Sequence, residues 1–284
     1  MLIRKNILLT GSEGRPMTTD LFVPDTADTL VIYTHGFNGF KDWGRFDLVA
    51  QQFADSGFGF VKFNTAHNGT TPEAPEDFAD TEAYGRNCYS FELEDLQAVV
   101  DWCLDERNEF LGGRMRRLFL LGHSRGGGVV LLKAADEPRV AAVATWASVA
   151  NAKTPWGSWP PGRMQQWREA GVDYYNNSRT GQRLPLYYSL YEDFERNRER
   201  FDIPAAVSRL RIPLLLCHGT RDEAVPVSAA YALRDAARDA ELFLVESDHV
   251  FGRRHPWTDD QLPEPMQAVV ERTIAFFKKI TEAV

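Results

Sequence analysis

The stretch "LFLLGHSRGGGVVLL", residues 118–132, joins two apolar segments through a cluster of glycines with one serine at its centre. The first segment has the composition of a short strand, and the second continues as an apolar helix. Gly122 lies two residues before Ser124, and Gly126 lies two residues after it. A chain that turns this sharply between a strand and a helix needs small residues on both sides of the corner. The pattern therefore predicts a tight corner that exposes the Ser124 hydroxyl at the carboxyl end of a strand.

Apolar strands and amphipathic helices alternate along the rest of the chain. Strands are expected at residues 29–37, 58–64, 117–122, 140–148, 212–219 and 241–247, and helices at residues 46–57, 90–106, 127–136, 228–240 and 264–280. The strands are apolar at nearly every position, which is typical of parallel strands that are covered on both faces. The sequence therefore predicts an α/β fold with a doubly wound, mostly parallel sheet.

Residues 151–204 interrupt this alternation. An insertion of this length in a compact α/β domain usually has a function of its own. We expect residues 1–150 and 205–284 to form one core domain. Residues 151–204 are expected to form an inserted cap, or lid, built from helices and loops.

The predicted cap is rich in aromatic residues, including three of the seven tryptophans of the chain. Ligand pockets are lined mainly by apolar and aromatic side chains, so some of these rings are expected to contact the ligand. The candidates are Trp156, Trp159, Tyr187 and Tyr188. At least half of the aromatic rings in the cap are expected to pack with one another instead, as a small core of the cap itself.

A serine hydroxyl is a weak nucleophile until a histidine takes its proton and an acid orients that histidine. In folds with a Gly-x-Ser-x-Gly corner between strand and helix, the order along the chain is serine, acid, histidine. Asp222 follows the strand expected at 212–219, and His249 follows the strand expected at 241–247. The carboxyl ends of parallel strands meet at one edge of the sheet. We therefore predict that Ser124, Asp222 and His249 form a catalytic triad.

Other residues near these strand ends are alternatives. Glu223 and Asp248 are the other candidate acids, but Asp248 adjoins His249, and side chains that are neighbours in sequence usually point in different directions. Ser148 ends a strand and is a candidate pocket residue, although it lacks the flanking glycines. The histidines expected to be structural are His123, His218 and His255.

Two backbone N–H groups are candidates for stabilising a negatively charged substrate oxygen. The N–H of Arg125 follows Ser124 at the start of a helix, where the helix dipole favours negative charge. His35 and Gly36 end an early strand and leave the N–H of Phe37 free to face the same place. We predict that Phe37 and Arg125 together form an oxyanion hole.

These motifs resemble the α/β-hydrolase superfamily, and within it the cinnamoyl and feruloyl esterases and the serine-aminopeptidase-like hydrolases. The resemblance rests on His35-Gly36-Phe37 with Lys41-Asp42, the Gly122–Gly127 corner, "HGTRDEAVP" at 218–226 and "DHVF" at 248–251. It implies a serine hydrolase that cleaves a carboxylic ester through an acyl-enzyme, using the triad and oxyanion hole named above. An aryl or hydroxycinnamoyl ester is one candidate substrate.

The chain departs from these relatives in two places. Ala66-His67-Asn68-Gly69 stands where they often have a Gly-His-Gly turn, and Arg125 stands where glutamine or methionine is common. These departures concern the identity of the substrate and do not change the expected chemistry. A peptidase, an amidase or an acyltransferase would use the same triad, and a non-catalytic ligand-binding protein on the same fold is the remaining alternative.

Composition limits the partners of the protein. The 284 residues carry a net charge of −8, which argues against nucleic acid or an anionic membrane surface as the main partner. The three cysteines lack the spacing of a metal site, and no apolar run reaches the roughly 18 residues of a membrane span. The N-terminus lacks the features of a signal peptide. We expect a cytoplasmic protein that needs no cofactor and acts on a small-molecule ester, and the sequence carries no signal for an oligomeric state.

Hydrolysis is expected to need no metal ion, because the expected nucleophile is a side chain and the sequence holds no cluster of metal ligands. Ester hydrolysis should therefore be unchanged after incubation with a chelator and gel filtration. Activity that disappears with the chelator and returns with zinc or manganese would contradict a serine mechanism.

Overall fold

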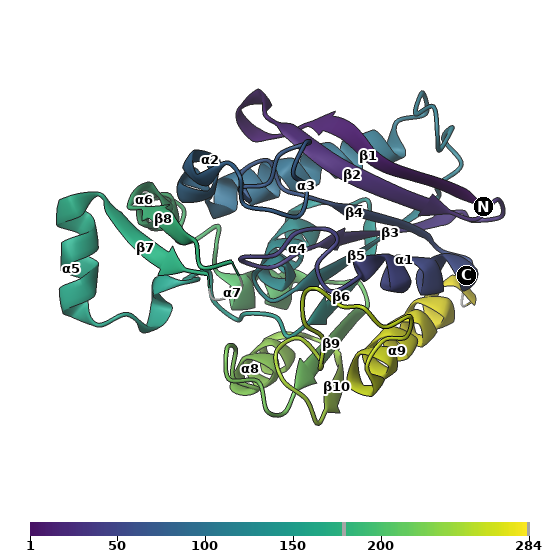
Figure 1. The fold of residues 1–284 in the computed structure, drawn as a ribbon. Coiled ribbons are helices and arrows are strands. Elements are labelled where there is room, and N and C mark those ends of the chain that lie inside the picture. The colour runs from purple at the N-terminus through teal and green to yellow at the C-terminus, as the bar shows by residue number, and fades with distance from the viewer. Residues whose placement is uncertain (178–179, 283–284) are drawn as a thin grey trace.

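The computed structural model describes residues 1–177 and 180–282. An eight-stranded sheet crosses the centre of the molecule, with helices on both faces (Figure 1). Its strands lie in the order β1-β2-β4-β3-β5-β6-β9-β10. They are β1 (Leu2–Thr10), β2 (Pro16–Val23), β3 (Thr29–Thr34), β4 (Gly59–Phe63), β5 (Arg117–His123), β6 (Val140–Trp146), β9 (Leu214–Gly219) and β10 (Glu241–Val245). All pairs from β4 to β10 are parallel, which confirms the predicted α/β fold.

Each face of the sheet has its own hydrophobic core. Helices α3 (Tyr89–Leu104), α4 (Arg125–Asp136), α7 (Ile203–Arg209) and α8 (Ser228–Ala236) cover one face, and α1 (Phe46–Asp55) and α9 (Glu264–Glu282) cover the other. In β3, Leu30 and Ile32 face the first core, whereas Val31 and Tyr33 face the second. Because both faces are covered, the central strands are apolar at successive positions.

The N-terminal hairpin was not expected from the sequence. β1 and β2 pair antiparallel, and β2 also pairs antiparallel with β4. β1 is an edge strand with mostly exposed side chains, and its register shifts between Arg4 and Ile7, where Asn6 has φ 55°. This bulge breaks the alternation of apolar and polar residues that would have marked β1 as a strand. A single turn of 3-10 helix, η1 (Ser12–Gly14), connects β1 and β2.

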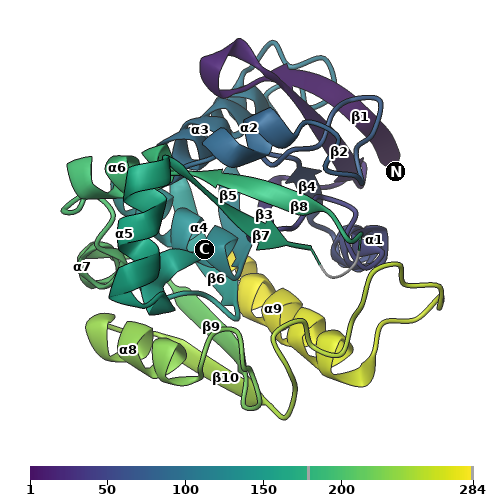
Figure 2. The same ribbon diagram turned by 60° about the vertical axis from the view of Figure 1, so that its left-hand side comes forward.

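The predicted cap contains strands as well as helices. Its elements are η2 (Trp156–Ser158), α5 (Pro161–Ala170), β7 (Val172–Asn176), β8 (Arg183–Tyr187) and α6 (Ser189–Arg196). Figure 2 shows α5 and the antiparallel hairpin β7–β8 lying in front of the central strands. Residues 178 and 179 of the predicted cap lie outside the described residues.

Contacts made by α6 and β8 help to attach the cap to the core. Asp193 of α6 accepts hydrogen bonds from the backbone N and from Oγ of Ser90, at 3.1 and 2.6 Å. β8 packs on the short helix α2 (Thr81–Arg86), where a Cβ atom on Gly85 would lie 3.0 Å from the Tyr187 ring. The predicted boundary at 204 falls inside α7, whose Ile203 side chain packs on Gly128 of α4. α7 therefore belongs to the helical layer of the core.

None of the helices within residues 1–177 and 180–282 has both the length and the apolar character that a membrane span requires.

Candidate active site

The backbone at the Ser124 corner is packed tightly against the end of β3. A Cβ atom on Gly122 would lie 2.3 Å from the Gly126 carbonyl oxygen, and one on Gly126 would lie 2.3 Å from the His35 carbonyl oxygen. Both positions therefore require glycine. Ser124 has φ 55° and ψ −121°, an unfavourable conformation that costs on the order of 1–3 kcal/mol in a residue other than glycine. Packing thus holds Ser124 in a strained turn between β5 and α4, on the wall of a cavity.

Asp222 and His249 follow β9 and β10 and contact each other. Nδ1 of His249 lies 2.8 Å from Oδ2 of Asp222. A carboxylate only accepts hydrogen bonds, so this contact places the proton of neutral His249 on Nδ1 and leaves Nε2 free to accept another. Ser124 and His249 both line the same cavity, whose volume is about 1100 Å³.

Several donors converge on the Asp222 carboxylate. Its Oδ1 accepts from the backbone N of Ala224 and Val225 at 2.9 and 2.8 Å, and Nε2 of His218 lies 3.3 Å from Oδ2. Burial alone would raise the pKa of Asp222, but hydrogen bonds from His218 and His249 outweigh it and hold this pKa below its ordinary value. Asp222 is therefore an anion at neutral pH and accepts the hydrogen bond of His249.

The alternative acids and the alternative serine have other surroundings. Glu223 is exposed. Asp248 is also exposed, and its Oδ1 accepts from the backbone N of Val250 and Gly252 at 3.2 and 2.8 Å. The Ser148 hydroxyl donates to the Val149 carbonyl at 3.0 Å. Asp222 is thus the acid that contacts His249.

The loop after β3 brings Phe37 beside Ser124. A Cβ atom on Gly36 would lie 2.9 Å from Cβ of Ser124, so the two backbones are in contact there. His35 fixes this loop, because its Nδ1 lies 3.0 Å from the Gly36 carbonyl and its Nε2 accepts from the backbone N of Thr65. Phe37 itself lines the cavity. The predicted oxyanion donor on this loop is therefore next to the predicted nucleophile.

Arg125 has two separate roles in the structure. Its backbone N–H lies at the first position of α4, where a helix offers it no acceptor. Its side chain is buried, bonds to Glu92 at 2.8 and 3.0 Å, donates to the Thr154 carbonyl at 2.9 Å and stacks on the Tyr89 ring. The guanidinium thus joins α3 to the start of the cap, whereas the N–H remains available beside Ser124.

Two of the other histidines named in the sequence analysis form hydrogen bonds with backbone groups around the site. Nε2 of His123 lies 2.9 Å from the carbonyl oxygen of His249, and the two rings are 4.8 Å apart. Burial lowers the pKa of His123 well below its ordinary value, so its ring is neutral and donates to that carbonyl. Nδ1 of His255 accepts from the backbone N of Gly44 at 3.1 Å. The sequence predicted a structural role for His123, and its hydrogen bond holds the backbone of His249.

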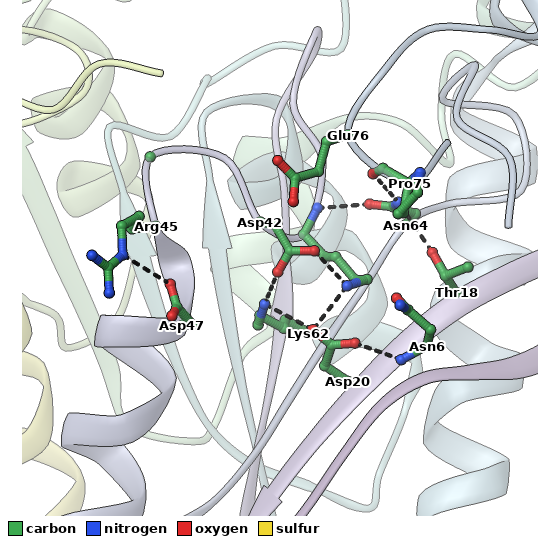
Figure 3. Close-up of polar contacts among 12 residues, drawn as sticks. Asn6, Thr18, Asp20, Asp42, Arg45, Asp47, Lys62, Asn64, Pro75 and Glu76 are labelled. Carbon is green, nitrogen blue, oxygen red and sulfur yellow. Dashed lines mark hydrogen bonds and ion pairs between the residues drawn. The ribbon is translucent and has the colours of Figure 1, made fainter. Parts of the chain in front are cut away.

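A buried group of four charges anchors the loop that carries Phe37. Figure 3 shows Asp20, Asp42 and Lys62 pointing toward one another. Nζ of Lys41 lies 2.8 Å from Asp20 Oδ2 and 2.5 Å from Asp42 Oδ2, and Nζ of Lys62 lies 2.9 Å from Asp20 Oδ2 and also bonds to Asp42. Lys41 and Asp42 belong to the loop, Asp20 to β2 and Lys62 to β4.

The four charges cancel as two cations and two anions. Burial would lower the pKa of Lys62, but Asp42 and Asp20 outweigh it and raise that pKa. Asn64 adds a neutral link, because its Oδ1 accepts from the backbone N of Lys41 at 2.6 Å. The ion cluster Asp20–Lys41–Asp42–Lys62 therefore ties the loop after β3 to the sheet.

The aromatic side chains that line the cavity come mainly from the core. Among the described residues they are Tyr33, Phe37, Phe40, Trp43 and Tyr175, of which Tyr175 belongs to the predicted cap. The charged side chains that the described residues place on this wall, histidine aside, are Lys153, Arg253 and Arg254. The cavity is thus aromatic and positively charged.

The four cap residues predicted to bind substrate lie away from this cavity wall. Trp156 is buried and packs on Trp167 with a ring distance of 6.0 Å, and Trp159 packs on Trp167 at 5.2 Å. Tyr188 stacks on Tyr191, and the Tyr187 hydroxyl bonds to Glu82. Most of these rings belong to a third hydrophobic cluster, which the cap shares with Phe40, Phe78 and Tyr84 of the core. Tyr175 and Phe37 line the cavity that holds Ser124 instead.

The fold and this site define a hydrolase of the α/β-hydrolase superfamily. The family model described as "Serine aminopeptidase, S33" matches residues 25–180, more than half of the chain, and the chain belongs to this family. The matched residues include the loop after β3 and the Ser124 corner. A search of curated proteins returns no match to this sequence.

Solved structures with the same fold include several esterases and lipases. Est1E from Butyrivibrio proteoclasticus with ferulic acid bound has a TM-score of 0.71 at 18% identity, over 97% of this chain and 99% of that one. The esterase domain of a Rhodothermus marinus protein gives 0.64 at 19% identity, over 98% and 99%. The monoacylglycerol lipase of Paleococcus ferrophilus gives 0.64 at 19% identity, over 92% and 99%. At this identity the likeness establishes the fold.

The ion cluster predicts a large effect of removing one charge. Lys62→Met leaves the buried Asp20 and the partly buried Asp42 with one cation, and breaking a buried ion pair in this way costs about 3–5 kcal/mol. Equilibrium unfolding in urea should show this loss. Arg221→Met, which removes a partner from the exposed pair with Glu246, is the control and should leave the unfolding midpoint nearly unchanged. Equal midpoints for Lys62→Met and wild type would contradict the role of the cluster.

Proposed function

We propose that the protein is a serine carboxylic-ester hydrolase. Ser124 is the nucleophile, His249 the general base and Asp222 the acid that orients His249. The observation that carries this proposal is the strained Ser124 corner on one cavity wall with His249, whose Nδ1 is bonded to Asp222. Strain of this kind persists where a function requires it.

The groups divide the reaction into two steps. Nε2 of His249 takes the proton from Ser124 Oγ as that oxygen attacks the acyl carbon, and the N–H groups of Phe37 and Arg125 stabilise the oxyanion. The intermediate collapses to an acyl-enzyme, and His249 gives its proton to the departing alcohol. Water then attacks the acyl carbon, His249 takes a proton from it, and the carboxylic acid leaves with Ser124 restored.

Asp222 acts by holding His249 in one tautomer and by supporting its positive charge. The contact at 2.8 Å supplies the orientation, and the low pKa of Asp222 keeps the carboxylate charged throughout turnover. His123 assists indirectly, because its hydrogen bond to the His249 carbonyl holds the backbone of the base.

The cavity favours an ester over an aminopeptidase substrate. An aminopeptidase binds the free α-ammonium group at the start of a peptide. Lys153, Arg253 and Arg254 line this cavity, so an ammonium group would meet like charges there. The aromatic wall of Phe37, Phe40 and Trp43 suits an apolar or aryl group. We propose an aryl ester, with hydroxycinnamoyl esters as one class to test.

Two other functions use the same residues. Amide hydrolysis needs the same triad, and acyl transfer replaces water with another acceptor. The cytoplasmic location expected from composition and cysteine usage stays a prediction, as does the oligomeric state. A screen of aliphatic, aryl and hydroxycinnamoyl esters with aminoacyl amides, each with and without added alcohol, separates these reactions.

Ser124→Ala should abolish hydrolysis while leaving the fold intact. Loss of the nucleophile of such a triad costs on the order of 10⁶ in kcat. The measurement is the hydrolysis rate of the best ester from the screen, with circular dichroism and thermal unfolding to confirm the fold. Ser148→Ala, at a serine near the same strand ends, is the matched control. Activity of Ser124→Ala above about one hundredth of wild type would remove Ser124 from the nucleophile role.

Asp222→Asn should keep the geometry and lose about 10⁴ in kcat, because an amide does not select the same tautomer or support the imidazolium. Asp248→Asn is the matched control, since it keeps the Oδ1 acceptor that bonds to Val250 and Gly252. Its kcat should stay close to wild type. A larger loss in Asp248→Asn than in Asp222→Asn would show that the acid is wrongly assigned.

A further inference from the structure

Arg253 is a buried cation on the cavity wall. It lies four residues after His249 in the loop before α9, and only 4% of it is exposed. Its Nε donates to the Val250 carbonyl at 3.3 Å, while Nη1 is buried without a hydrogen-bond partner. Among the residues that the structure describes, Arg253 forms no ion pair within 4.0 Å. Burying a charge without a partner costs free energy. The burial of Arg253 therefore points to a partner from outside the chain, namely a ligand.

Most of the other buried cations in the described part of the chain have a carboxylate partner. Lys41 and Lys62 each contact two carboxylates, and Arg125 is paired with Glu92, whereas Lys133 donates to the Gln97 side chain. Arg253 instead packs among rings, with its guanidinium 5.4 Å from the Trp43 ring and 5.1 Å from the Phe46 ring. Burial lowers the pKa of Arg253 to about 10, so its side chain is still charged at neutral pH.

The Arg253 side chain is held in place from two directions. Its aliphatic part packs against Gly44. A Cβ atom added to Gly44 would lie 3.6 Å from Arg253 Cβ and 3.7 Å from Arg253 Cδ. The Val250 carbonyl accepts from both the backbone N and Nε of Arg253, each at 3.3 Å. The guanidinium is thus fixed in position without using its two terminal nitrogens.

Tyr33 supplies a second donor on the same wall. Tyr33 is buried, lines the cavity, and makes no hydrogen bond through its hydroxyl within residues 1–177 and 180–282. Burial raises the pKa of Tyr33, and the nearby charge of Arg253 opposes that rise. The hydroxyl is therefore protonated and able to donate. Within the described part of the chain these two donors, one of them charged, are unused, and both side chains line the cavity that holds Ser124.

We propose that Arg253 and Tyr33 form a subsite for a carboxylate group of the substrate, so that the ester carries a carboxylate besides the bond that is cleaved. The inference rests on the proposed esterase function and specifies its substrate class. The two terminal nitrogens of a guanidinium match the two oxygens of a carboxylate. One guanidinium also balances the single charge of a carboxylate.

Arg253 of the proposed subsite and the catalytic histidine His249 share a neighbour, His123. Arg253 and His249 both lower the pKa of His123, whose ring is 4.8 Å from that of His249. Arg253 and His249 also line the same cavity, so a carboxylate bound at Arg253 would lie in the cavity that holds the catalytic histidine.

Matched pairs of esters test the subsite. 4-Nitrophenyl monoesters of adipic and suberic acid carry a carboxylate on the acyl side, and 3-acetoxybenzoate carries one on the alcohol side. Each is compared with its methyl ester. Charge-assisted hydrogen bonds predict that wild type prefers the carboxylate form in at least one pair by about 10- to 100-fold in kcat/KM. A ratio near one in every pair overturns the proposal.

Arg253→Gln is the decisive variant, and the preference should fall to about one because Gln cannot supply the charge. Arg254→Gln changes the exposed neighbour, whose charge is screened by solvent, and should keep most of the preference. Loss of the preference in Arg254→Gln but not in Arg253→Gln overturns the assignment. If Arg253→Gln fails to fold, Arg253→Lys keeps the charge without the paired donors, and an unchanged ratio in it counts against the subsite.

Ligand binding separates this inference from the esterase proposal. In Ser124→Ala, monomethyl adipate should raise the thermal unfolding midpoint and dimethyl adipate should not, and the difference should vanish in the Ser124→Ala, Arg253→Gln double variant. Binding without hydrolysis of any ester by wild type would leave the subsite standing and reject the esterase. Hydrolysis of the methyl esters without binding of monomethyl adipate would reject the subsite alone.

Discussion

The close contact between the Ser124 corner and the end of β3 is the constraint on which the site depends. Gly126 leaves no room for a side chain against the His35 carbonyl, and Gly36 leaves none against Ser124. The two loops can approach only because these positions are glycine. That approach brings the loop that carries Phe37 against Ser124, at the start of α4. The remaining groups of the site are arranged around this contact.

Buried charges have two different roles around the site. In the ion cluster Asp20–Lys41–Asp42–Lys62 every charge is balanced inside the protein, so the cluster acts on structure and holds the loop that carries Phe37. Arg253 is equally buried, but its terminal nitrogens find no carboxylate in the described part of the chain. A cluster whose charges cancel stabilises the fold. A buried cation without a carboxylate partner is costly, and binding of an anionic ligand would remove that cost. The proposed carboxylate subsite follows from this difference.

The sequence predicted the features that local pattern encodes. Apolar strands, amphipathic helices and the glycines around Ser124 identified the sheet and the corner, and strand ends located Asp222 and His249. The edge strand β1 was not predicted, because its bulge at Asn6 breaks the alternation of apolar and polar residues. The cap rings could not be assigned from sequence, since a tryptophan such as Trp156 looks the same whether it faces a ligand or packs on Trp167. Arg253 could not be recognised either, because its burial depends on Gly44 and Phe46, about two hundred residues earlier in the chain.

Covalent labelling with a fluorophosphonate, followed by peptide mass mapping, tests the central claim most directly. The reagent reacts with a serine that an adjacent histidine activates and that an oxyanion hole serves, so it reports on the assembled site without any choice of substrate. The account predicts one adduct per folded chain, located on Ser124, with labelling abolished by prior unfolding and strongly slowed in His249→Ala. A folded protein that stays unlabelled, or an adduct on Ser148 or another serine, would contradict it.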